Sequence, residues 1–507
     1  MTYLDRYFEH CDANERKSSA IAFWASLDHI SSQNPEVCSG ILREFQDQSS
    51  YLKLIASENY SSLATQQAMG NLLTDKYAEG ISGKRFYAGC GNVDDLEARA
   101  SQLLIDIFAC DHAYVQPHSG ADANLVAFWA ILQTRVQNKE VERLGKKSID
   151  ELSPEEYEQV RQLLVNQKVL GMSLNSGGHL THGYRHNISS KMMQSFSYDV
   201  DPKTNLLDYD QIAKRAREVQ PTILLAGYSA YPRKINFAKM REIADDVNAV
   251  LMVDMAHFSG LVAGKVFTGD YNPIPHAHVV TSTTHKTLRG PRGGLVLCQK
   301  EFAEAVDKGC PLVLGGPLPH VMAAKAVAFY EASLPSFQNY AQKIVENASA
   351  LAESLMQRGV PVLTNGTDNH LLITDIRKFG LTGRQGELAL REAGVTLNRN
   401  TIPFDENGPW YTSGLRMGTP ALTSLGMGKE EMNEVASIIV EVLENTKATV
   451  VERTGQASKA KSETLENVRL ESLDRVHKLL DQFHLYPELK LREVAGLKAD
   501  KVSPMTT

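Results

Sequence analysis

The 507-residue chain lacks the cysteine patterns, the long apolar segments and the leader that would mark a secreted or membrane protein. Its six cysteines form no C-x-x-C pair and no zinc-ligand spacing, and such scattered cysteines are typical of a reducing compartment. No apolar run approaches the roughly 20 residues that span a bilayer. The first ten residues carry acids and no apolar core, unlike a secretory signal. We therefore expect a cytoplasmic protein with no membrane partner.

Nucleotide-binding signatures are missing as well. The chain has no G-x-x-x-x-G-K-[ST] and no strand-linked G-x-G-x-x-G, so nucleoside-triphosphate and dinucleotide functions lose their main support. The net charge of −7 is spread along the chain, which argues against a nucleic-acid partner. What remains is a globular composition, 43% hydrophobic and 22% charged, in a chain long enough for two or three domains.

Strand and helix patterns divide the chain into three parts. Residues 1–50 are predicted to form an N-terminal helical segment. Residues 51–325 alternate short apolar runs with longer helical patterns, which predicts a large α/β domain with a mainly parallel sheet covered on both faces. Residues 326–507 predict a smaller C-terminal α+β domain that ends in a frayed tail at 497–507. The runs that predict strands of the large domain are 113–115, 169–172, 222–226, 249–253, 279–280 and 294–297.

Residues 138–167 interrupt this rhythm. The segment is densely charged, and its apolar residues are spaced out rather than clustered. Within it, Ser153-Pro154-Glu155-Glu156 has a capping residue, a proline at the first helical position and a glutamate three residues after the cap. We interpret 138–167 as a largely solvated helical insertion, with partner binding as the alternative.

The stretch from His278 to Gly294 carries the strongest chemical signal. A short apolar strand gives way to hydroxyl residues, then to His285-Lys286, then to a glycine-rich turn. Lysine is rarely buried without a partner, and a lysine directly after a buried strand suits a Schiff base with pyridoxal phosphate. From this segment alone, a surface lysine on a loop explains the pattern equally well.

Three further sites, at Asp254, Ser119-Gly120 and Arg416, could act together with Lys286. Asp254 ends the strand at 249–253, where a carboxylate could keep a pyridine nitrogen protonated, although such an aspartate is usually a helix cap. Ser119-Gly120 follows a strand and opens a helix, so its N–H groups could bind a phosphate, although an ordinary capped helix looks the same. Arg416 follows a predicted strand and could bind a substrate carboxylate or form a structural ion pair.

Two polar segments are predicted to form loops. Residues 77–89 are punctuated by glycine and contain tyrosines and a glutamate, and residues 174–183 follow a predicted strand and contain two histidines. A histidine above a strand end can stack on a planar cofactor, but a histidine in a glycine-rich loop is more often solvated.

Together these segments resemble the serine hydroxymethyltransferase family, pyridoxal-phosphate enzymes with the aspartate-aminotransferase-like fold (fold type I). The resemblance covers about residues 51–443 and implies a large domain with a mainly parallel seven-stranded sheet plus the smaller α+β domain. It implies reversible transfer of the serine hydroxymethyl group to tetrahydrofolate, giving glycine and 5,10-methylenetetrahydrofolate, by aldimine chemistry of pyridoxal 5'-phosphate in a homodimer with shared active sites. The motifs that carry it are 54–60, 77–87, 177–183, 253–257, 283–294, 367–371 and 413–420.

The resemblance also implies a role for each matching residue. The implied cofactor contacts are Lys286 as the Schiff-base lysine, Asp254 at the pyridinium nitrogen, His179 on the ring, Ser229 and His257 at the phenolic oxygen, and Ser119, Gly120 and a partner-derived Gly316 at the phosphate. The implied catalytic residues are Lys286, a partner-derived Glu79 as acid–base group, Thr283 and His285 beside the lysine, and Tyr87 near the substrate. The implied substrate contacts are Ser57, Arg416 and a partner-derived Tyr77, and the implied folate contacts are Leu174, Gly178, Leu180 and Asn400.

The chain departs from the common family pattern at several positions. Ala121 and Asp122 stand in the phosphate turn, where a hydroxyl residue is usual, and this suggests weaker cofactor binding. Phe86 replaces a usual tyrosine and Ile81-Ser82 replaces a usual Tyr-Pro, which puts folate contacts in doubt. Leu312-Val313 stands where the family usually has a pair of glycines. Two other functions therefore remain open: an aldolase that cleaves β-hydroxy amino acids without folate, and a protein that binds the cofactor for regulation or assembly.

Overall fold

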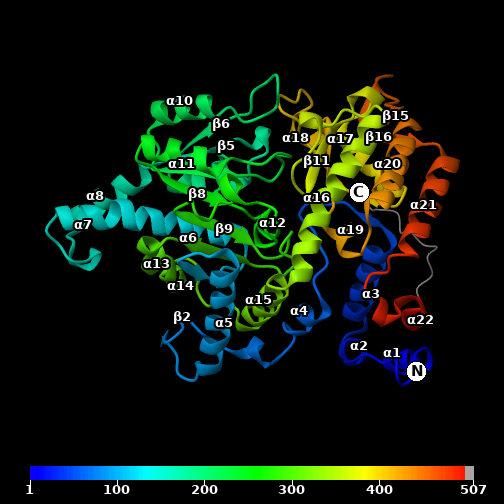
Figure 1. Cartoon of the computed structure of the whole chain (residues 1–507), viewed down its shortest axis with the longest axis horizontal. Helices are drawn as coiled ribbons and strands as arrows, with labels where there is room; N and C mark the ends of the chain where they lie inside the picture. Colours follow the sequence, from blue (N-terminus) through cyan, green and yellow to red (C-terminus); the bar gives the residue numbers. More distant parts are fainter. Residues whose placement is uncertain (497–507) are drawn as a thin grey trace.

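A seven-stranded sheet forms the centre of the larger half of the molecule, in a computed structural model that describes residues 1–496 (Figure 1). The strand order is β4-β10-β9-β8-β7-β5-β6, and β10 alone runs antiparallel to its neighbours. This confirms the predicted mainly parallel sheet. The strands are β4 (His112–Tyr114), β5 (Lys168–Met172), β6 (Gln194–Tyr198), β7 (Ile223–Gly227), β8 (Val250–Asp254), β9 (Val279–Thr283) and β10 (Gly294–Cys298).

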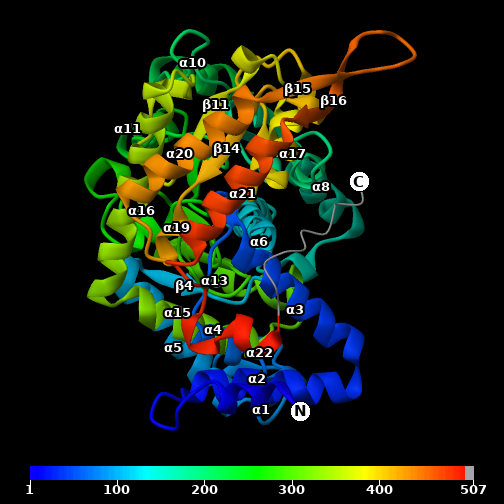
Figure 2. The ribbon, with the colours of Figure 1, turned by 90° about the vertical axis from the view of Figure 1, so that its right-hand side faces the viewer.

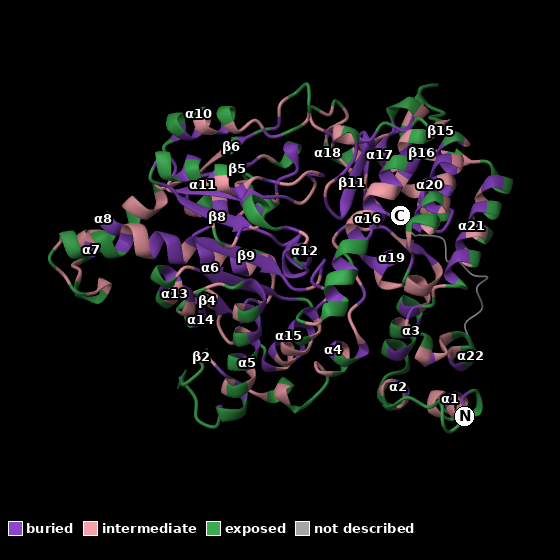
Figure 3. Ribbon diagram, viewed as in Figure 1, coloured by how far each residue is buried: buried purple, intermediate pink, exposed green. Residues whose placement is uncertain are grey.

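Helices cover both faces of this sheet, and that is why its inner strands are apolar throughout (Figure 3). In β7, Ile223 and Leu225 pack in one apolar cluster with α6 and α13, while Leu224 and Ala226 pack in another with α11 and α15. Both faces are therefore buried, as a parallel sheet requires. The flanking helices are α5 (Gly91–Phe108), α6 (Gly120–Leu132), α10 (Tyr209–Val219), α11 (Phe237–Asp246), α12 (Ser259–Ala263), α13 (Lys300–Asp307), α15 (Pro319–Ala332) and α16 (Pro335–Gln357).

The predicted strands all fall on observed strands, but the sequence analysis missed β6. This strand lies at the sheet edge and pairs only with β5. Its sequence QSFSY alternates polar and aromatic residues, so it contains no continuous apolar run. An edge strand needs only one buried face, and a search for strands buried on both faces therefore overlooks it.

The smaller C-terminal part is built on a three-stranded antiparallel sheet, with β11 (Leu371–Asp375), β14 (Gly414–Gly418) and β13 (Asn398–Asn400) in that order. Its helices and strands share a separate apolar core. A hairpin formed by β15 (Thr446–Val450) and β16 (Ala457–Thr464) projects from this part (Figure 2). The remaining elements here are β12 (Val395–Thr396), which pairs with β1 (Leu52–Lys53), and α17 (Gly383–Glu392), α18 (Gly408–Tyr411), α19 (Pro420–Ser424), α20 (Lys429–Glu444) and α21 (Glu466–Leu480).

The N-terminal segment is helical and lies beside the end of the described chain (Figure 2). It contains α1 (Tyr3–Glu9), α2 (Ser18–Gln33) and α3 (Pro35–Ser50), and the Asn34 side chain caps α3 by accepting from the N–H of Val37 at 3.2 Å. The buried Trp24 donates from Nε1 to the Leu489 carbonyl at 3.0 Å, next to α22 (Leu491–Ala495). The predicted frayed tail, residues 497–507, lies outside the described residues.

The predicted insertion projects from the large domain (Figure 1). Helix α6 continues through a π-helical turn, Gln133–Gln137, into α7 (Asn138–Arg143), and a loop leads to α8 (Pro154–Val165). The predicted start of α8 is confirmed, because Ser153 and Glu156 form a reciprocal capping box. Among the described residues, no helix combines the length and the apolar character that a membrane crossing requires.

Candidate active site

A cavity of about 790 Å³ lies between the carboxyl ends of the central strands and the smaller domain. Such a crevice is where ligands bind in open α/β sheets. The cavity brings together most of the residues predicted from the sequence: Ser57, Ser119, Gly120, Leu174, Gly178, His179, Leu180, Ser229, Asp254, His257, Thr283, His285, Lys286, Asn400 and Arg416.

Asp254, the last residue of β8, presents a buried anion to this cavity. Its Oδ2 accepts from Asn124 Nδ2 at 2.9 Å and from His182 Nε2 at 3.2 Å, and its Oδ1 accepts from the Ala256 N–H at 3.0 Å. Burial alone would raise the pKa of this carboxyl, but these hydrogen bonds and the nearby imidazoles hold the pKa well below its usual range. Asp254 therefore stays ionised at neutral pH.

Lys286 is a buried amine without a hydrogen-bond acceptor among the described residues. It follows β9 by three residues, and its backbone carbonyl is held by Asn59 Nδ2 at 2.9 Å. Burial, assisted by the positive charges of Arg416 and Arg292, lowers its pKa to about 8, although Asp254 acts in the opposite direction. A desolvated lysine with a lowered pKa is a competent nucleophile toward a carbonyl group.

The turn at Ser119 and Gly120 places a helix N-terminus at the cavity. Ser119 Oγ caps α6 by accepting from the Asp122 N–H at 3.1 Å. A Cβ at Gly120 would lie 2.6 Å from Thr283 Cγ2, so the approach of this turn to the end of β9 requires glycine. The N–H groups and the dipole at the start of α6 could therefore hold an anion beside the Lys286 segment.

Arg416 offers a guanidinium to the cavity without an acidic partner among the described residues. It donates from one terminal nitrogen to the Ser229 carbonyl at 2.7 Å and from Nε to Asn398 Oδ1 at 3.1 Å. Burial lowers its pKa to about 10, so it stays charged at neutral pH. An arginine that is oriented by neutral groups and lacks a carboxylate is ready to bind one from a ligand.

The histidines of the cavity are neutral. Burial lowers the pKa of His179 to about 4 and that of His285 to about 3, and it lowers the pKa of His257 well below its usual range. His179 is oriented by Thr181, whose hydroxyl lies 2.8 Å from Nδ1. A free amine, a buried carboxylate, an anion site and neutral rings in one cavity are the groups that pyridoxal phosphate requires, so these residues fit that cofactor.

Four predicted site residues lie outside this cavity and form a second group. The hydroxyls of Tyr77 and Tyr87 both reach the Glu79 carboxylate, at 3.4 Å each, and the two rings meet edge to face. Gly316 is also close, since a Cβ there would lie 3.3 Å from the Tyr77 ring. Tyr77 is 57% exposed and Tyr87 48% exposed, so one chain alone leaves this group facing outward.

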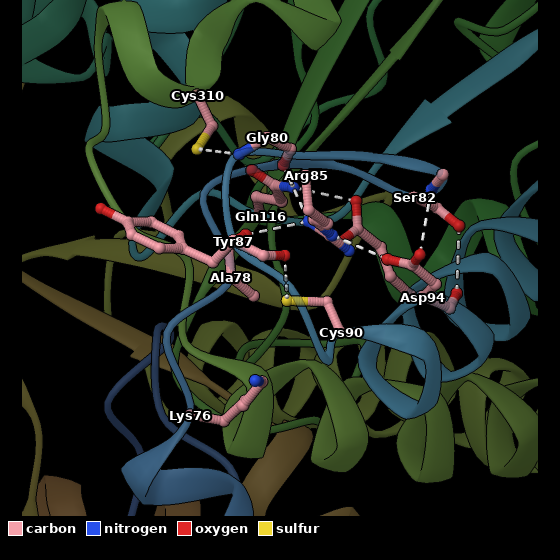
Figure 4. Close-up of polar contacts among 12 residues, drawn as sticks. Lys76, Ala78, Gly80, Ser82, Arg85, Tyr87, Cys90, Asp94, Gln116 and Cys310 are labelled. Atoms are coloured by element: carbon pink, nitrogen blue, oxygen red, sulfur yellow. Dashed lines mark hydrogen bonds and ion pairs between the residues drawn. The ribbon is translucent and has the colours of Figure 1, made fainter.

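The segment that carries Glu79 is firmly held (Figure 4). Residues 77–89 were expected to form a loop, but β2 (Gly80–Ile81) and β3 (Lys84–Arg85) pair as a short hairpin. Arg85 fixes this hairpin through ion pairs with Asp94 at 2.7 Å and Glu97 at 2.5 Å and a hydrogen bond to the Gly80 carbonyl at 2.8 Å. The ion pairs join Arg85 to residues 9 and 12 positions farther along, on α5, and the glycine-punctuated composition of the segment does not reveal them.

The family model for serine hydroxymethyltransferase matches residues 30–141 and 156–439. The chain belongs to this family. It is 59% identical over 472 residues to serine hydroxymethyltransferase of Treponema pallidum, covering 93% of this chain and 82% of the relative. It is 56% identical to that of Mycolicibacterium smegmatis, covering 94% and 96%, and 53% identical to that of Chlamydia trachomatis serovar D, covering 96% and 98%. The unmatched interval lies within the projecting segment 138–167.

Sequence reasoning assigned no role to three residues that hydrogen-bond to Asp254 and His179 in the serine hydroxymethyltransferase site. Asn124 and His182 both donate to Asp254, and Thr181 connects Asn124 to His179. Asn124 lies five residues after Ser119, and Thr181 and His182 lie within residues 177–183. All three are therefore in or directly after motifs that the sequence analysis named. The available signal was a polar side chain in the first turns of the apolar helix α6 for Asn124, and polar side chains in the loop after β5 for Thr181 and His182.

One of the two residues that differ from the family pattern in the Ser119 turn, Ala121, lies at the cavity. The carboxylate of the other, Asp122, lies 3.8 Å from His118 Nδ1. The substitution Ala121→Ser should add a hydroxyl donor at the turn and strengthen binding of pyridoxal phosphate about two- to tenfold, the usual worth of one hydrogen bond. Equilibrium dialysis checks this, with pyridoxal as a control because it lacks the phosphate. Equal cofactor affinities of Ala121→Ser and wild type would contradict it.

Proposed function

We propose that this chain catalyses the reversible transfer of the serine hydroxymethyl group to tetrahydrofolate, giving glycine and 5,10-methylenetetrahydrofolate, with pyridoxal phosphate as cofactor. Family membership supports this activity. The observation that carries it is one cavity that contains a buried carboxylate together with a lysine amine and an arginine that have no acceptor and no acid, respectively, among residues 1–496. These three groups are Lys286, Asp254 and Arg416.

We assign the cofactor to the residues that meet in the cavity. The assigned contacts are Lys286 for the covalent link, Asp254 for the pyridine nitrogen, His179 for the ring, Ser229 and His257 for the phenolic oxygen, and Ser119 and Gly120 for the phosphate. When bound there, pyridoxal phosphate withdraws electrons from the α-carbon of an amino acid and stabilises the negative charge that develops. Because Asp254 stays ionised, it holds the proton on the pyridine nitrogen on which this withdrawal depends.

The chain's own groups position the substrate and move protons. Arg416, with Ser57 beside it in the cavity, binds the substrate carboxylate and so fixes the orientation of the α-carbon. Lys286, with a pKa of about 8, is partly unprotonated near neutral pH, so its Nζ can both accept and return a proton. Thr283 and His285 flank this amine, and the neutral His285 adds no competing charge.

We assign the folate to the mouth of the cavity. Leu174 and Leu180 are 40% and 44% exposed there, although both are large apolar side chains. Gly178 and Asn400 line the same cavity and offer polar groups. An apolar rim with a few oriented polar groups suits a flat heterocycle such as the pterin ring.

We further propose a cytoplasmic homodimer in which Tyr77, Glu79 and Gly316 complete the partner's cavity. The support is that Tyr77 donates to the Glu79 carboxylate beside a hairpin fixed by Arg85, while this group lies outside the cavity of its own chain. Exposed apolar side chains surround it, with Phe86 67% and Leu312 60% exposed, as expected for a surface that a second copy covers. In this assembly the Glu79 carboxylate acts on the proton of the substrate hydroxyl or of a folate nitrogen.

One experiment tests the proposed function against its alternatives. The purified protein is loaded with pyridoxal phosphate, and exchange of the glycine α-proton in D₂O is followed by NMR with and without tetrahydrofolate. Exchange that tetrahydrofolate accelerates supports the hydroxymethyltransferase. Exchange that is indifferent to folate indicates the aldolase, and no exchange indicates a protein that only binds the cofactor.

A conservative change at Arg416 should separate binding from chemistry. Arg416→Lys keeps the charge but loses the two-pronged geometry, so we expect KM for serine to rise about 10- to 100-fold, with a smaller change in kcat. Arg399→Lys is the matched control, because Arg399 lines the same cavity but is already paired with Glu387. Steady-state kinetics at varied serine concentration measure both variants. Equal KM values for Arg416→Lys and Arg399→Lys would rule out this role.

A further inference from the structure

Lys325, on α15, is a buried lysine that the proposed reaction does not use. Only 1% of it is exposed, and its Nζ donates to three backbone carbonyls, of Val115 at 2.5 Å, Pro117 at 2.9 Å and Gly294 at 2.8 Å. No carboxylate among the described residues is in contact with it. Burying a charge without an opposite charge beside it costs free energy of folding, which suggests that this lysine has a function.

The three acceptors around Lys325 favour the charged form. Three acceptor oxygens need three N–H donors, and only the ammonium has three, because a neutral amine would turn its lone pair toward a carbonyl. Burial lowers the pKa of Lys325 to about 7, while the negative charges of Glu97 and Asp122 act in the opposite direction. An additional anion near this lysine would therefore favour the ammonium.

The three carbonyls belong to the two segments that build the site. Val115 and Pro117 lead from β4 into the Ser119 turn, and Gly294 begins β10 after the loop that carries Lys286. The N–H of Gly294 also donates to the Pro117 carbonyl at 2.9 Å, which draws the two segments together. The fit is close, since a Cβ at Gly293 would lie 2.5 Å from Lys325 Cε.

We propose that Lys325 is a positioning residue of the phosphate site. Its ammonium fastens the Ser119 turn to the segment after Lys286, and its positive charge offsets the Asp122 carboxylate that stands in this turn. This assignment rests on the proposed function, because it takes the Ser119 turn as the place of the cofactor phosphate. It explains how the turn tolerates an acid next to a dianion.

The test compares pyridoxal phosphate with pyridoxal, which lacks the phosphate. Lys325→Met keeps the length of the side chain and removes the charge, and we expect it to weaken binding of pyridoxal phosphate about tenfold or more, as for loss of charged hydrogen bonds, while pyridoxal binding changes less. Lys168→Met is the matched control, because Lys168 also donates to a backbone carbonyl, that of Val219 at 2.9 Å, at the opposite end of the sheet.

Two further measurements keep the assignment falsifiable. Lys325→Gln keeps amide N–H donors but lacks the charge. We expect this variant to fold even if Lys325→Met does not, and to bind pyridoxal phosphate more weakly than the wild type does. Inorganic phosphate should raise the Tm of the wild-type protein without cofactor, but not that of either Lys325 variant. Equal losses for pyridoxal phosphate and pyridoxal, or no loss at all, overturn the role of Lys325. Failure of the wild type to bind pyridoxal phosphate overturns the proposed function instead.

Discussion

Replacing Lys286 by alanine is expected to abolish covalent attachment of pyridoxal phosphate and to lower serine turnover by about 10³-fold or more, as when a nucleophile is removed. The reason is that Lys286 is the one amine of the cavity that combines burial, a pKa of about 8 and no hydrogen-bond acceptor among the described residues. Borohydride reduction of the loaded protein followed by peptide mass spectrometry checks the attachment site.

The control for Lys286→Ala is Lys265→Ala. Lys265 is another lysine of the large domain, two residues after α12, but its Nζ is occupied by the Ile107 carbonyl at 2.6 Å. We expect Lys265→Ala to retain the reduced adduct on Lys286 and near-normal turnover. An adduct that persists in Lys286→Ala, or that maps to a different lysine in the wild type, would overturn the site assignment.

The central strands of the sheet could be predicted because their signal, an apolar run followed by a polar residue, lies within a few neighbouring residues. β7 and β8 are apolar on both faces, and Asp254 and Lys286 come at or just after strand ends, where parallel strands deliver side chains to one edge. The edge strand β6 could not be predicted in this way, since one of its faces is polar. The pattern of burial therefore decides which strands can be recognised from the sequence.

The parts of the site that escaped prediction depend on contacts between distant segments. Lys325 meets the Val115 carbonyl 210 positions away, and Asn124 meets Asp254 130 positions away. In the sequence, Lys325 is one lysine within a helical pattern, and nothing local shows that its side chain enters the core. The resemblance to a family could supply roles for contact residues, but it could not supply the interactions that hold them.

Replacing Glu79 is expected to have the second large effect on turnover. Glu79→Gln keeps the shape of the side chain and removes its ability to exchange a proton, so we expect kcat for serine to fall about 10²- to 10⁴-fold, the usual contribution of a general acid–base group. Cofactor binding should remain near normal, because Glu79 is not among the residues that we assign to the cofactor. Steady-state kinetics and equilibrium dialysis measure the two quantities separately.

Mixing inactive variants shows whether Glu79 serves its own chain or the partner. A dimer of one Glu79→Gln chain and one Lys286→Ala chain has one intact site if Glu79 acts across the interface, and equal amounts should recover roughly a quarter of wild-type activity after subunit exchange. Lys286→Ala mixed with Arg416→Ala is the matched control: both residues line the cavity of one chain, so no mixed dimer has an intact site. Recovery in the first mixture alone requires a shared active site, because only residues on different chains can complement one another in this way. No recovery in either mixture would place Glu79 outside the partner's site.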